Sequence, residues 1–166
     1  MGPMEKAQIE FTYHIYQSSD DLDENQRLLL KKARGKLLNA YAPYSEFRVA
    51  AAIELANGEL VFGTNQENAA YPSGLCAERV AIFAAKSNFP DERIVRMAIT
   101  AQGHHEILVP IPPCGACRQV MLEFELNQYE PIELILAGTK GKIYTLSNVK
   151  GLLPLYFSHL DLKKGV

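Results

Sequence analysis

Two short stretches decide the fold and the chemistry of this chain: Cys76-Ala77-Glu78-Arg79 and Pro113-Cys114-Gly115-Ala116-Cys117. They contain all three cysteines of the 166-residue sequence. The two-residue gap between Cys114 and Cys117 lets two sulfurs reach one metal ion. Three thiolates suit a zinc ion with one coordination position left for water or substrate, whereas a structural zinc site closes all four. The stretches therefore predict a catalytic Zn²⁺ with Cys76, Cys114 and Cys117 as its ligands.

Glu78 follows the first expected ligand by two residues, so its carboxylate should lie beside the ion rather than on it. Zinc lowers the pKa of a bound water from about 15.7 towards 7, and a neighbouring carboxylate can take up and pass on the proton. Without the cysteines, the better interpretation would be a first-turn glutamate that favours the helix dipole. With them, we predict that Glu78 is the catalytic acid–base.

Both stretches fall where helices should begin, and the positive end of a helix dipole favours thiolates. Arg79 and Arg118 each directly follow one stretch, and either could donate hydrogen bonds to the sulfurs. Such donors would reduce the thiolate charge and keep the metal a good Lewis acid. The alternative for both arginines is a solvated helix side chain. Gly115 is expected to allow a tight turn between the paired cysteines.

Other interpretations of the cysteines fit less well. A redox pair or a disulfide would leave Cys76 and Glu78 without a role. A closed structural zinc site needs a fourth protein ligand, and none of the four histidines lies at ligand spacing from a cysteine.

Helices and strands alternate on both sides of the two stretches. Periodicity predicts helices near residues 23–41, 76–86 and 114–126, and strands near 47–55, 60–65, 94–101, 132–137 and 143–146. Asn57-Gly58 between the first two strands is typical of a tight hairpin. In the second helix Ala77, Ala81 and Ala85 share one face, which should approach a sheet closely. This order predicts a three-layer α/β/α fold with a mixed five-stranded sheet.

Residues 1–22 precede this pattern as an N-terminal extension. Within it Ile9, Phe11, Tyr13 and Ile15 recur at every second position, which is the period of a strand. We expect an extra strand here that adds an edge to the sheet or covers a subunit interface. Residues 23–166 are expected to form a single domain, because a chain of this length suits one hydrophobic core.

Composition argues against several classes of protein. The net charge of −2 offers no electrostatic grip on nucleic acid or on an anionic membrane. No apolar run approaches the roughly 20 residues of a membrane span, and no basic stretch followed by an apolar core predicts secretion. An odd number of cysteines with one close pair suits metal binding in a reducing compartment. We therefore expect a cytoplasmic protein that binds neither nucleic acid nor membrane.

The two stretches together resemble the zinc-dependent cytidine deaminases of the small, homotetrameric, three-cysteine type. In zinc deaminases a His/Cys-x-Glu segment is paired with Pro-Cys-x-x-Cys, and the glutamate moves protons. Residues 41–47, 65–71 and 152–157 are also similar to family segments, and the resemblance covers about residues 25–162. It implies a cytidine-deaminase-like fold with Zn²⁺. It also implies hydrolytic deamination of cytidine and deoxycytidine to uridine and deoxyuridine, with release of ammonia, in pyrimidine salvage.

The resemblance further implies a set of substrate contacts. Phe47 would lie against the pyrimidine ring, while Asn65 and Glu67 would hydrogen-bond the sugar hydroxyls. The backbone at Ala77 would contact the base, and Phe157 would reach into the site of a neighbouring subunit in a homotetramer. The alternatives are ordinary loop capping for Asn65 and Glu67 and core packing of the tail for Phe157.

Two other functions remain open at this point. One is a deaminase of another aminated nucleoside, such as a blasticidin-like antibiotic. The other is a non-catalytic, zinc-stabilised nucleoside-binding protein. A deaminase that acts on polynucleotides is disfavoured, because the chain lacks the basic groove that such substrates require.

Overall fold

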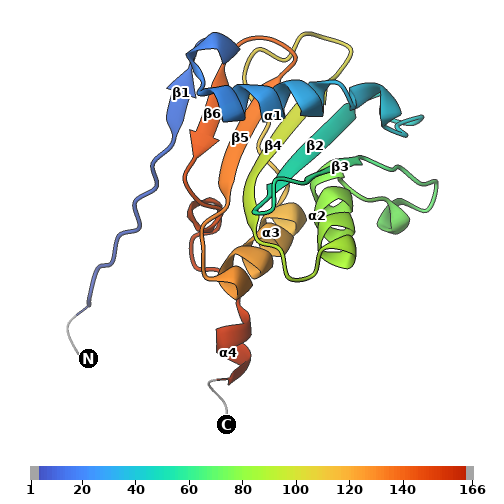
Figure 1. The fold of residues 1–166 in the computed structure, drawn as a ribbon. Coiled ribbons are helices and arrows are strands. Elements are labelled where there is room, and N and C mark those ends of the chain that lie inside the picture. Colours follow the sequence, from blue (N-terminus) through green and yellow to red (C-terminus); the bar gives the residue numbers. More distant parts are fainter. Residues whose placement is uncertain (1–3, 164–166) are drawn as a thin grey trace.

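A six-stranded mixed sheet forms the middle layer of the molecule (Figure 1). The computed structural model describes residues 4–163, so the outermost parts of the predicted extension and domain, 1–3 and 164–166, lie outside the described residues. The strand order is β1-β6-β5-β4-β2-β3; β4 and β5 are parallel and all other neighbours are antiparallel. The strands are β1 (His14–Tyr16), β2 (Arg48–Leu55), β3 (Leu60–Thr64), β4 (Ile94–Gln102), β5 (Glu133–Gly138) and β6 (Ile143–Leu146).

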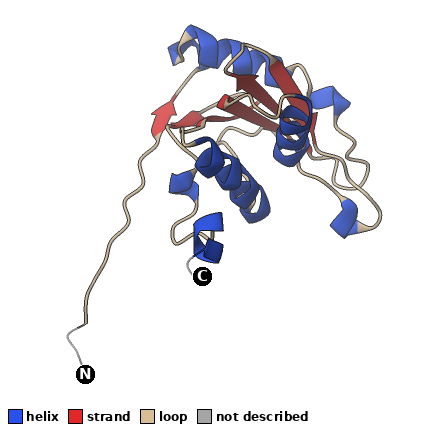
Figure 2. Ribbon diagram, turned by 60° about the horizontal axis from the view of Figure 1, so that its bottom comes forward, coloured by secondary structure: helices blue, strands red, loops and turns tan. Residues whose placement is uncertain are grey.

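Helices cover both faces of this sheet, which confirms the predicted three-layer arrangement (Figure 2). On one face α1 (Glu24–Arg34) buries Leu29, Leu30 and Ala33 against β2, β4 and β5. On the other face α2 (Ala77–Asn88) and α3 (Gly115–Gln128) pack side by side over a larger apolar core. The short helix α4 (His159–Lys163) ends the described chain. No helix among residues 4–163 has both the length and the apolarity needed to cross a bilayer.

Two predictions of local structure were wrong. The sheet has six strands rather than five, because the extra edge strand expected in the extension forms at His14–Tyr16 and pairs antiparallel with β6. The helix predicted for residues 23–41 ends at Arg34, and Leu37–Asn39 forms a separate 3₁₀ turn. Gly35, a weak helix former, follows Arg34. After it the backbone hydrogen bonds span three residues instead of four, because the N–H of Lys36 donates to the carbonyl of Ala33 at 2.9 Å. The tighter turn directs Leu37 into the core.

Helix α2 lies against β3 with backbone touching backbone at Gly63. A Cβ atom on Gly63 would lie less than 3.0 Å from the backbone of Ala77 and Ala81. Both alanines are fully buried, so small side chains on the helix and none on the strand make the approach possible. This contact fits the small-residue face that the sequence predicted, and it sets the height of the first turn of α2 above the sheet.

We expect Gly63→Ala to destabilise the fold by about 1–3 kcal/mol, because the added methyl group forces α2 away from β3. Urea unfolding measures this change. Gly115→Ala is the matched control, since a Cβ at Gly115 meets nothing within 4 Å. Equal unfolding midpoints for the two variants would show that the close approach at Gly63 carries no energetic weight.

Glu125 joins the C-terminal half of α3 to two later segments of the chain. Its buried carboxylate accepts hydrogen bonds from the backbone N–H groups of Ile132 (2.9 Å), Val149 (2.6 Å) and Lys150 (2.9 Å). It therefore holds the start of β5 and the segment after β6 against α3. Buried backbone donors cost free energy when they have no acceptor, so this carboxylate anchors both segments.

We expect Glu125→Ala to lower the free energy of unfolding by about 3 kcal/mol or more, because three backbone donors lose one charged acceptor. Thermal or urea unfolding reports the loss. Glu123→Ala removes a half-buried glutamate from the same helix, which accepts one side-chain hydrogen bond from Asn127, and should change stability by less than about 0.5 kcal/mol. A small effect of Glu125→Ala would mean that water replaces the carboxylate without penalty.

Candidate metal centre and substrate pocket

The three cysteines meet where α2 and α3 begin, on the same face of the sheet. Cys76 is the residue before the first turn of α2, Cys114 holds the same place in α3, and Cys117 lies in the first turn of α3. All three sulfurs lie within 4.8 Å of one another. The Sγ atoms of Cys76 and Cys114 are 3.9 Å apart, and those of Cys114 and Cys117 are 3.5 Å apart. The structure therefore brings together the three predicted ligands.

This spacing fits a zinc ion. Three sulfurs at the corners of a tetrahedron, each about 2.3 Å from Zn²⁺, lie about 3.8 Å from one another. The two measured separations fall on either side of this value. Cys117 is buried and Cys114 is exposed, so the cluster is closed on its inner side and open towards solvent. An open side is what a catalytic zinc site requires for its fourth position.

The role predicted for Gly115 was wrong. Gly115 is the first residue of α3, its φ lies outside the left-handed region, and there is space for a side chain. An ordinary helical turn therefore brings Cys114 and Cys117 together, and the conformational freedom of glycine is not needed.

The thiols polarise one another even without a metal. A hydrogen bond from Cys117 is the main cause that lowers the pKa of Cys76 to about 5, and Cys114 and Arg79 lower it further against the effect of burial. The same hydrogen bond, followed by burial, raises the pKa of Cys117. Near neutral pH Cys76 is therefore a thiolate while Cys117 keeps its proton. A metal ion that recruits all three sulfurs must displace that proton.

The two arginines contact different groups. Arg79 lies close enough to Cys76 for its hydrogen bond and charge to lower the pKa of that thiol. Its buried Nε has no hydrogen-bond partner among the described residues. Arg118 was expected to donate to a sulfur, but its hydrogen bonds go to backbone carbonyls. Its Nε donates to the carbonyl of Pro113 at 2.7 Å, and its Nη1 donates to the carbonyl of Leu152 at 3.1 Å.

Glu78 is buried in the first turn of α2, with a relative exposure of only 4%. It lines the same pocket as Cys76 and Cys114. Burial, and then the negative charge of Cys76, raise the pKa of the Glu78 carboxyl. A carboxyl group with a raised pKa exchanges its proton more readily near neutral pH, which is what a general acid–base needs.

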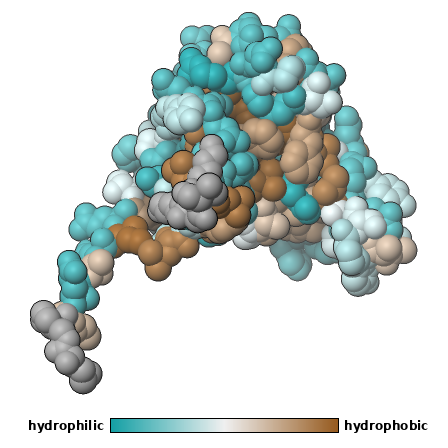
Figure 3. All heavy atoms as spheres, turned by 90° about the horizontal axis from the view of Figure 1, so that it is seen from below, coloured by the Kyte–Doolittle hydropathy of each residue, from teal (hydrophilic) through white to brown (hydrophobic). Residues whose placement is uncertain are grey.

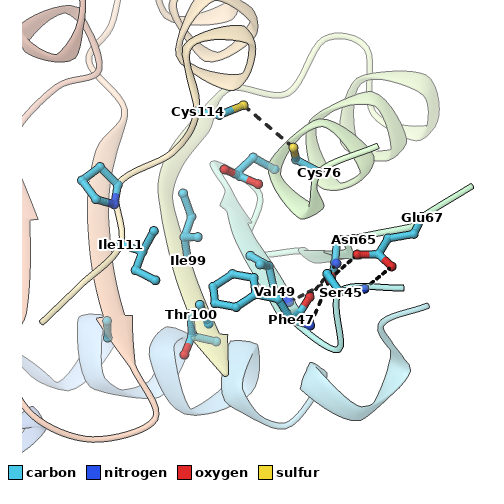
Figure 4. A pocket seen from close by; sticks show the side chains of 14 residues that line it. Ser45, Phe47, Val49, Asn65, Glu67, Cys76, Ile99, Thr100, Ile111 and Cys114 are labelled. Carbon is cyan, nitrogen blue, oxygen red and sulfur yellow. Dashed lines mark hydrogen bonds between the residues drawn. The ribbon is translucent and has the colours of Figure 1, made fainter. Parts of the chain in front are cut away.

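A cavity of about 460 Å³ extends from the cysteines across the sheet (Figure 4). Its size suits a small-molecule ligand. In Figure 4 the sulfurs of Cys76 and Cys114 face each other at one end, and Ser45, Asn65 and Glu67 lie together at another. The residues that line the cavity are Ser45, Phe47, Val49, Asn65, Glu67, Cys76, Glu78, Ile99, Thr100, Ala101, Ile111, Pro112, Cys114 and Ala137.

Two residues that were expected to contact substrate do not line this cavity. Ala77 is the first residue of α2 and is fully buried where that helix approaches β3. Phe157 is 57% exposed, and its carbonyl accepts a hydrogen bond from Gln119 Nε2 at 2.9 Å. Within a single chain, Phe157 is therefore outside the pocket and outside the core.

Asn65 positions Phe47 at the mouth of the pocket. Its Oδ1 accepts from Val49 N–H at 2.8 Å, and its Nδ2 donates to the carbonyl of Phe47 at 2.9 Å. These two bonds hold the chain just before and within β2 in place. The ring of Phe47 then packs over Gly103, where a Cβ would lie 3.3 Å from Cδ2 of the ring.

Ser45 is a pocket residue that the sequence analysis missed. Its hydroxyl donates to the carboxylate of Glu67, which also accepts from the N–H groups of Tyr44 (3.0 Å) and Ser45 (3.2 Å). The hydroxyl of Ser45 is the main cause that lowers the pKa of Glu67. Glu67 is therefore ionised near neutral pH and serves as a hydrogen-bond acceptor. The signal for Ser45 was its place within residues 41–47, which resemble a family segment.

The floor of the pocket was also missed. It comes from β4 and β5, through Ile99, Thr100, Ala101 and Ala137, and from the loop residues Ile111 and Pro112. In the sequence Ile99, Ala101 and Ala137 are ordinary apolar positions of buried strands, and Thr100 is a single polar residue among them. No local pattern marks the end of a strand that will face a pocket.

Comparisons with known proteins agree with this geometry. Residues 23–129 match the family described as "Cytidine and deoxycytidylate deaminase zinc-binding region". A cytidine deaminase from Halalkalibacterium halodurans is 37% identical over 138 residues, which are 83% of this chain and 98% of that protein. One from Sporosarcina psychrophila is 42% identical over 132 residues, which are 80% of this chain and 88% of that protein.

A solved structure shows the same fold. The crystal structure of cytidine deaminase from Burkholderia pseudomallei superposes with a TM-score of 0.67 at 37% sequence identity, and the match covers 78% of this chain and 97% of that one. The three-cysteine cluster provides the ligands that the zinc-binding family requires, so the cofactor is Zn²⁺. From its sequence, its fold and its metal centre, the chain belongs to the cytidine and deoxycytidylate deaminase family.

Proposed function

We propose that this chain is a zinc-dependent enzyme that hydrolyses cytidine and deoxycytidine to uridine and deoxyuridine and releases ammonia. One observation carries the proposal. The buried acid–base Glu78 and the three-cysteine cluster lie at one end of a pocket that has Asn65 and Glu67 at another. Such a pocket can hold the amino-bearing edge of a base near Glu78 and a sugar near the polar side chains.

The proton transfers are assigned to Glu78. Cys76, Cys114 and Cys117 would hold Zn²⁺, which would supply Lewis acidity and lower the pKa of a water bound to it. The Glu78 carboxylate accepts a proton from the attacking water and delivers it to N3 of the ring. Glu78 then accepts the second proton of that water and gives it to the departing amino group. One water is consumed, ammonia leaves from C4, and Glu78 returns to its starting state.

The pocket walls account for the choice of substrate. The ring of Phe47, with Val49 and Ile99, forms an apolar wall against which a flat pyrimidine can pack. Glu67 is ionised and lies beside Asn65, so acceptors for sugar hydroxyl groups are at hand. The backbone at Ala77 would contact the base. These roles favour a plain nucleoside over a modified antibiotic nucleoside.

The biological setting is part of the proposal. We place the deaminase domain at residues 23–166, with residues 1–22 as an extension, and the enzyme in pyrimidine salvage in the cytoplasm. A reducing compartment would keep the three thiols available for zinc. We further propose a homotetramer in which Phe157 of one subunit reaches the site of a neighbour. Its 57% exposure in the single chain supports this arrangement.

Absorbance loss with cytidine, combined with ammonia and zinc assays, tests the activity. We expect equal amounts of uridine and ammonia from cytidine, loss of turnover after treatment with a chelator, and recovery when zinc is added. Deoxycytidine should also react. Faster turnover of blasticidin S than of cytidine would favour the antibiotic deaminase. A zinc-loaded protein that binds cytidine without releasing ammonia would be a binding protein instead.

A further inference from the structure

Residues 4–13 leave the body of the molecule as an extended arm (Figure 1). From Ile9 onward, in the half of the arm nearest the body, apolar side chains occur at every second position and continue into β1. Ile9 is 58% exposed, Phe11 44%, Tyr13 41% and Ile15 48%. Side chains two apart on an extended chain lie on one side, so the arm has an apolar side and a polar side. A continuous apolar row in solvent marks an interaction surface.

The base of the arm is anchored, so its direction is set by the body. β1 pairs with β6, and the ring of Tyr13 lies 5.0 Å from the ring of Tyr144 on β6. The ring of Phe11 stacks on Tyr13 at 5.6 Å, and a Cβ on Gly151 would lie 2.6 Å from it. Beyond Phe11, Gln8 Nε2 donates a hydrogen bond to Glu10 Oε1 at 3.3 Å, which lies within the arm itself.

Beyond Phe11 the arm does not fold back onto its own body, and Ile9 is 58% exposed. Figure 1 shows the arm running away from the sheet rather than across it. Burial of its apolar side therefore requires another molecule.

A second copy of this chain offers the matching surface. The C-terminal segment lies on the same lower side of the molecule as the arm (Figure 1), and Figure 3 shows hydrophobic side chains on the arm and on this lower face. The segment exposes Leu155 (92%), Leu160 (52%) and Leu162 (70%), together with Phe157, which is assigned above to the site of a neighbour. A symmetric pair of chains would give each arm and each C-terminal segment a partner.

Charge also favours a copy over other partners. Residues 4–13 contain two glutamates and one lysine, and the whole chain has a net charge of −2. Neither provides the basic surface that nucleic acid or an anionic membrane requires. An apolar arm with few charges suits an equally apolar and weakly charged surface.

We propose that the arm of each chain packs on a second copy, with Ile9 and Phe11 against residues 155–162 of that copy. The inference rests on the self-association proposed above, and it assigns to the extension the task of holding subunits together. It involves no residue of the metal centre. It can therefore fail while the deaminase activity stands.

Ile9→Glu tests the contact, and Thr12→Glu is the matched control on the other side of the same arm. Ile9 is exposed in the single chain, so its replacement should leave the fold of the subunit intact. Sedimentation equilibrium should show the subunit dissociation constant rising at least about tenfold with Ile9→Glu, as for loss of one buried anchor. Thr12→Glu should change it less than about twofold. Equal effects of the two variants would overturn the proposal.

Cross-linking identifies the surface that the arm contacts. A photoreactive p-benzoylphenylalanine replaces Ile9 in a mixture of unlabelled and ¹⁵N-labelled chains. We expect cross-links from position 9 to residues 155–162 that join a labelled chain to an unlabelled one. Cross-links confined to single chains, or to other segments, would contradict the contact.

These experiments distinguish the arm contact from self-association and from deaminase activity. A wild-type protein that stays monomeric would refute both self-association and the arm contact. An assembled protein in which Ile9→Glu behaves like Thr12→Glu would refute the arm contact alone. Cytidine turnover of the wild-type protein reports on the deaminase activity independently.

Discussion

Replacing Glu78 by alanine is expected to lower kcat for cytidine by about 10⁴-fold, at the upper end of what one general acid–base contributes. Glu78 lines the pocket beside Cys76 and Cys114, and it is the residue assigned to every proton transfer in the proposed reaction. The three sulfurs are untouched by the change, so the variant should still bind one zinc ion per chain. Steady-state kinetics together with metal analysis measure both effects.

The same variant separates a catalytic from a structural role. Burial raises the pKa of Glu78 from its ordinary value of 4.5, so the folded chain favours the protonated form. The stability that this group contributes is present below pH 4.5 and is lost as the pH rises through the raised pKa. At neutral pH the zinc-free alanine variant should therefore be at least as stable as the wild type. A glutamate that only favoured the helix dipole would instead stabilise the chain.

Glu123→Ala is the control for this experiment, because it removes a half-buried glutamate of α3 that does not line the pocket. It should leave kcat, zinc content and stability nearly unchanged. Near-normal turnover in Glu78→Ala would end the assignment of Glu78 as the proton carrier.

Cys117→Ala is expected to abolish turnover and to weaken zinc binding by more than about 100-fold. Losing a residue that merely orients a ligand already costs about 10–100-fold in metal affinity, and loss of a ligand should cost more. Alanine suits the test because Cys117 is fully buried in the apolar core, where a small apolar side chain is tolerated. Competition with a chromophoric chelator measures the affinity.

The wild-type affinity for zinc should rise with pH. Cys117 has a raised pKa and keeps its proton in the metal-free chain, so zinc binding must release that proton. Ala116→Ser, at the exposed neighbouring position, is the control and should bind zinc as the wild type does. A Cys117→Ala variant that retained tightly bound zinc would show that Cys117 is not a ligand.

Much of the fold could be predicted because its signals are local. Asn57-Gly58 predicted a hairpin, and Gly58 has the left-handed φ of 85° that its turn requires. The end of α1 at Arg34 was not predicted, because helical spacing continues through Leu37 although the chain tightens after Gly35. Periodicity records which side chains face the core but does not show where the backbone changes from one helix type to another.

The candidate site, like the fold, could be predicted from the sequence only in part. The spacing of Cys76, Glu78, Cys114 and Cys117 follows from the chemistry of one metal ion, so it could be recognised in the sequence. The contact of Arg118 with the carbonyl of Leu152 could not, because the two residues are 34 positions apart. The direction of the Arg118 side chain depends on where the segment after β6 returns to α3. Many weak contacts together set the position of that segment.

The sequence by itself indicated the candidate metal ligands and proton carrier, because Cys76 with Glu78 and Cys114 with Cys117 form two short motifs. It also determined the alternation of helices and strands, because the periodicity of each element is local. Only the tertiary structure decided that the starts of α2 and α3 meet, with Cys76 and Cys114 sulfurs 3.9 Å apart. That meeting depends on two helices packing on one face of the sheet and on the close approach of α2 at Gly63. The tertiary structure also joined Ser45, Thr100 and Ala137 into one pocket, because strand order rather than chain order sets which residues are neighbours.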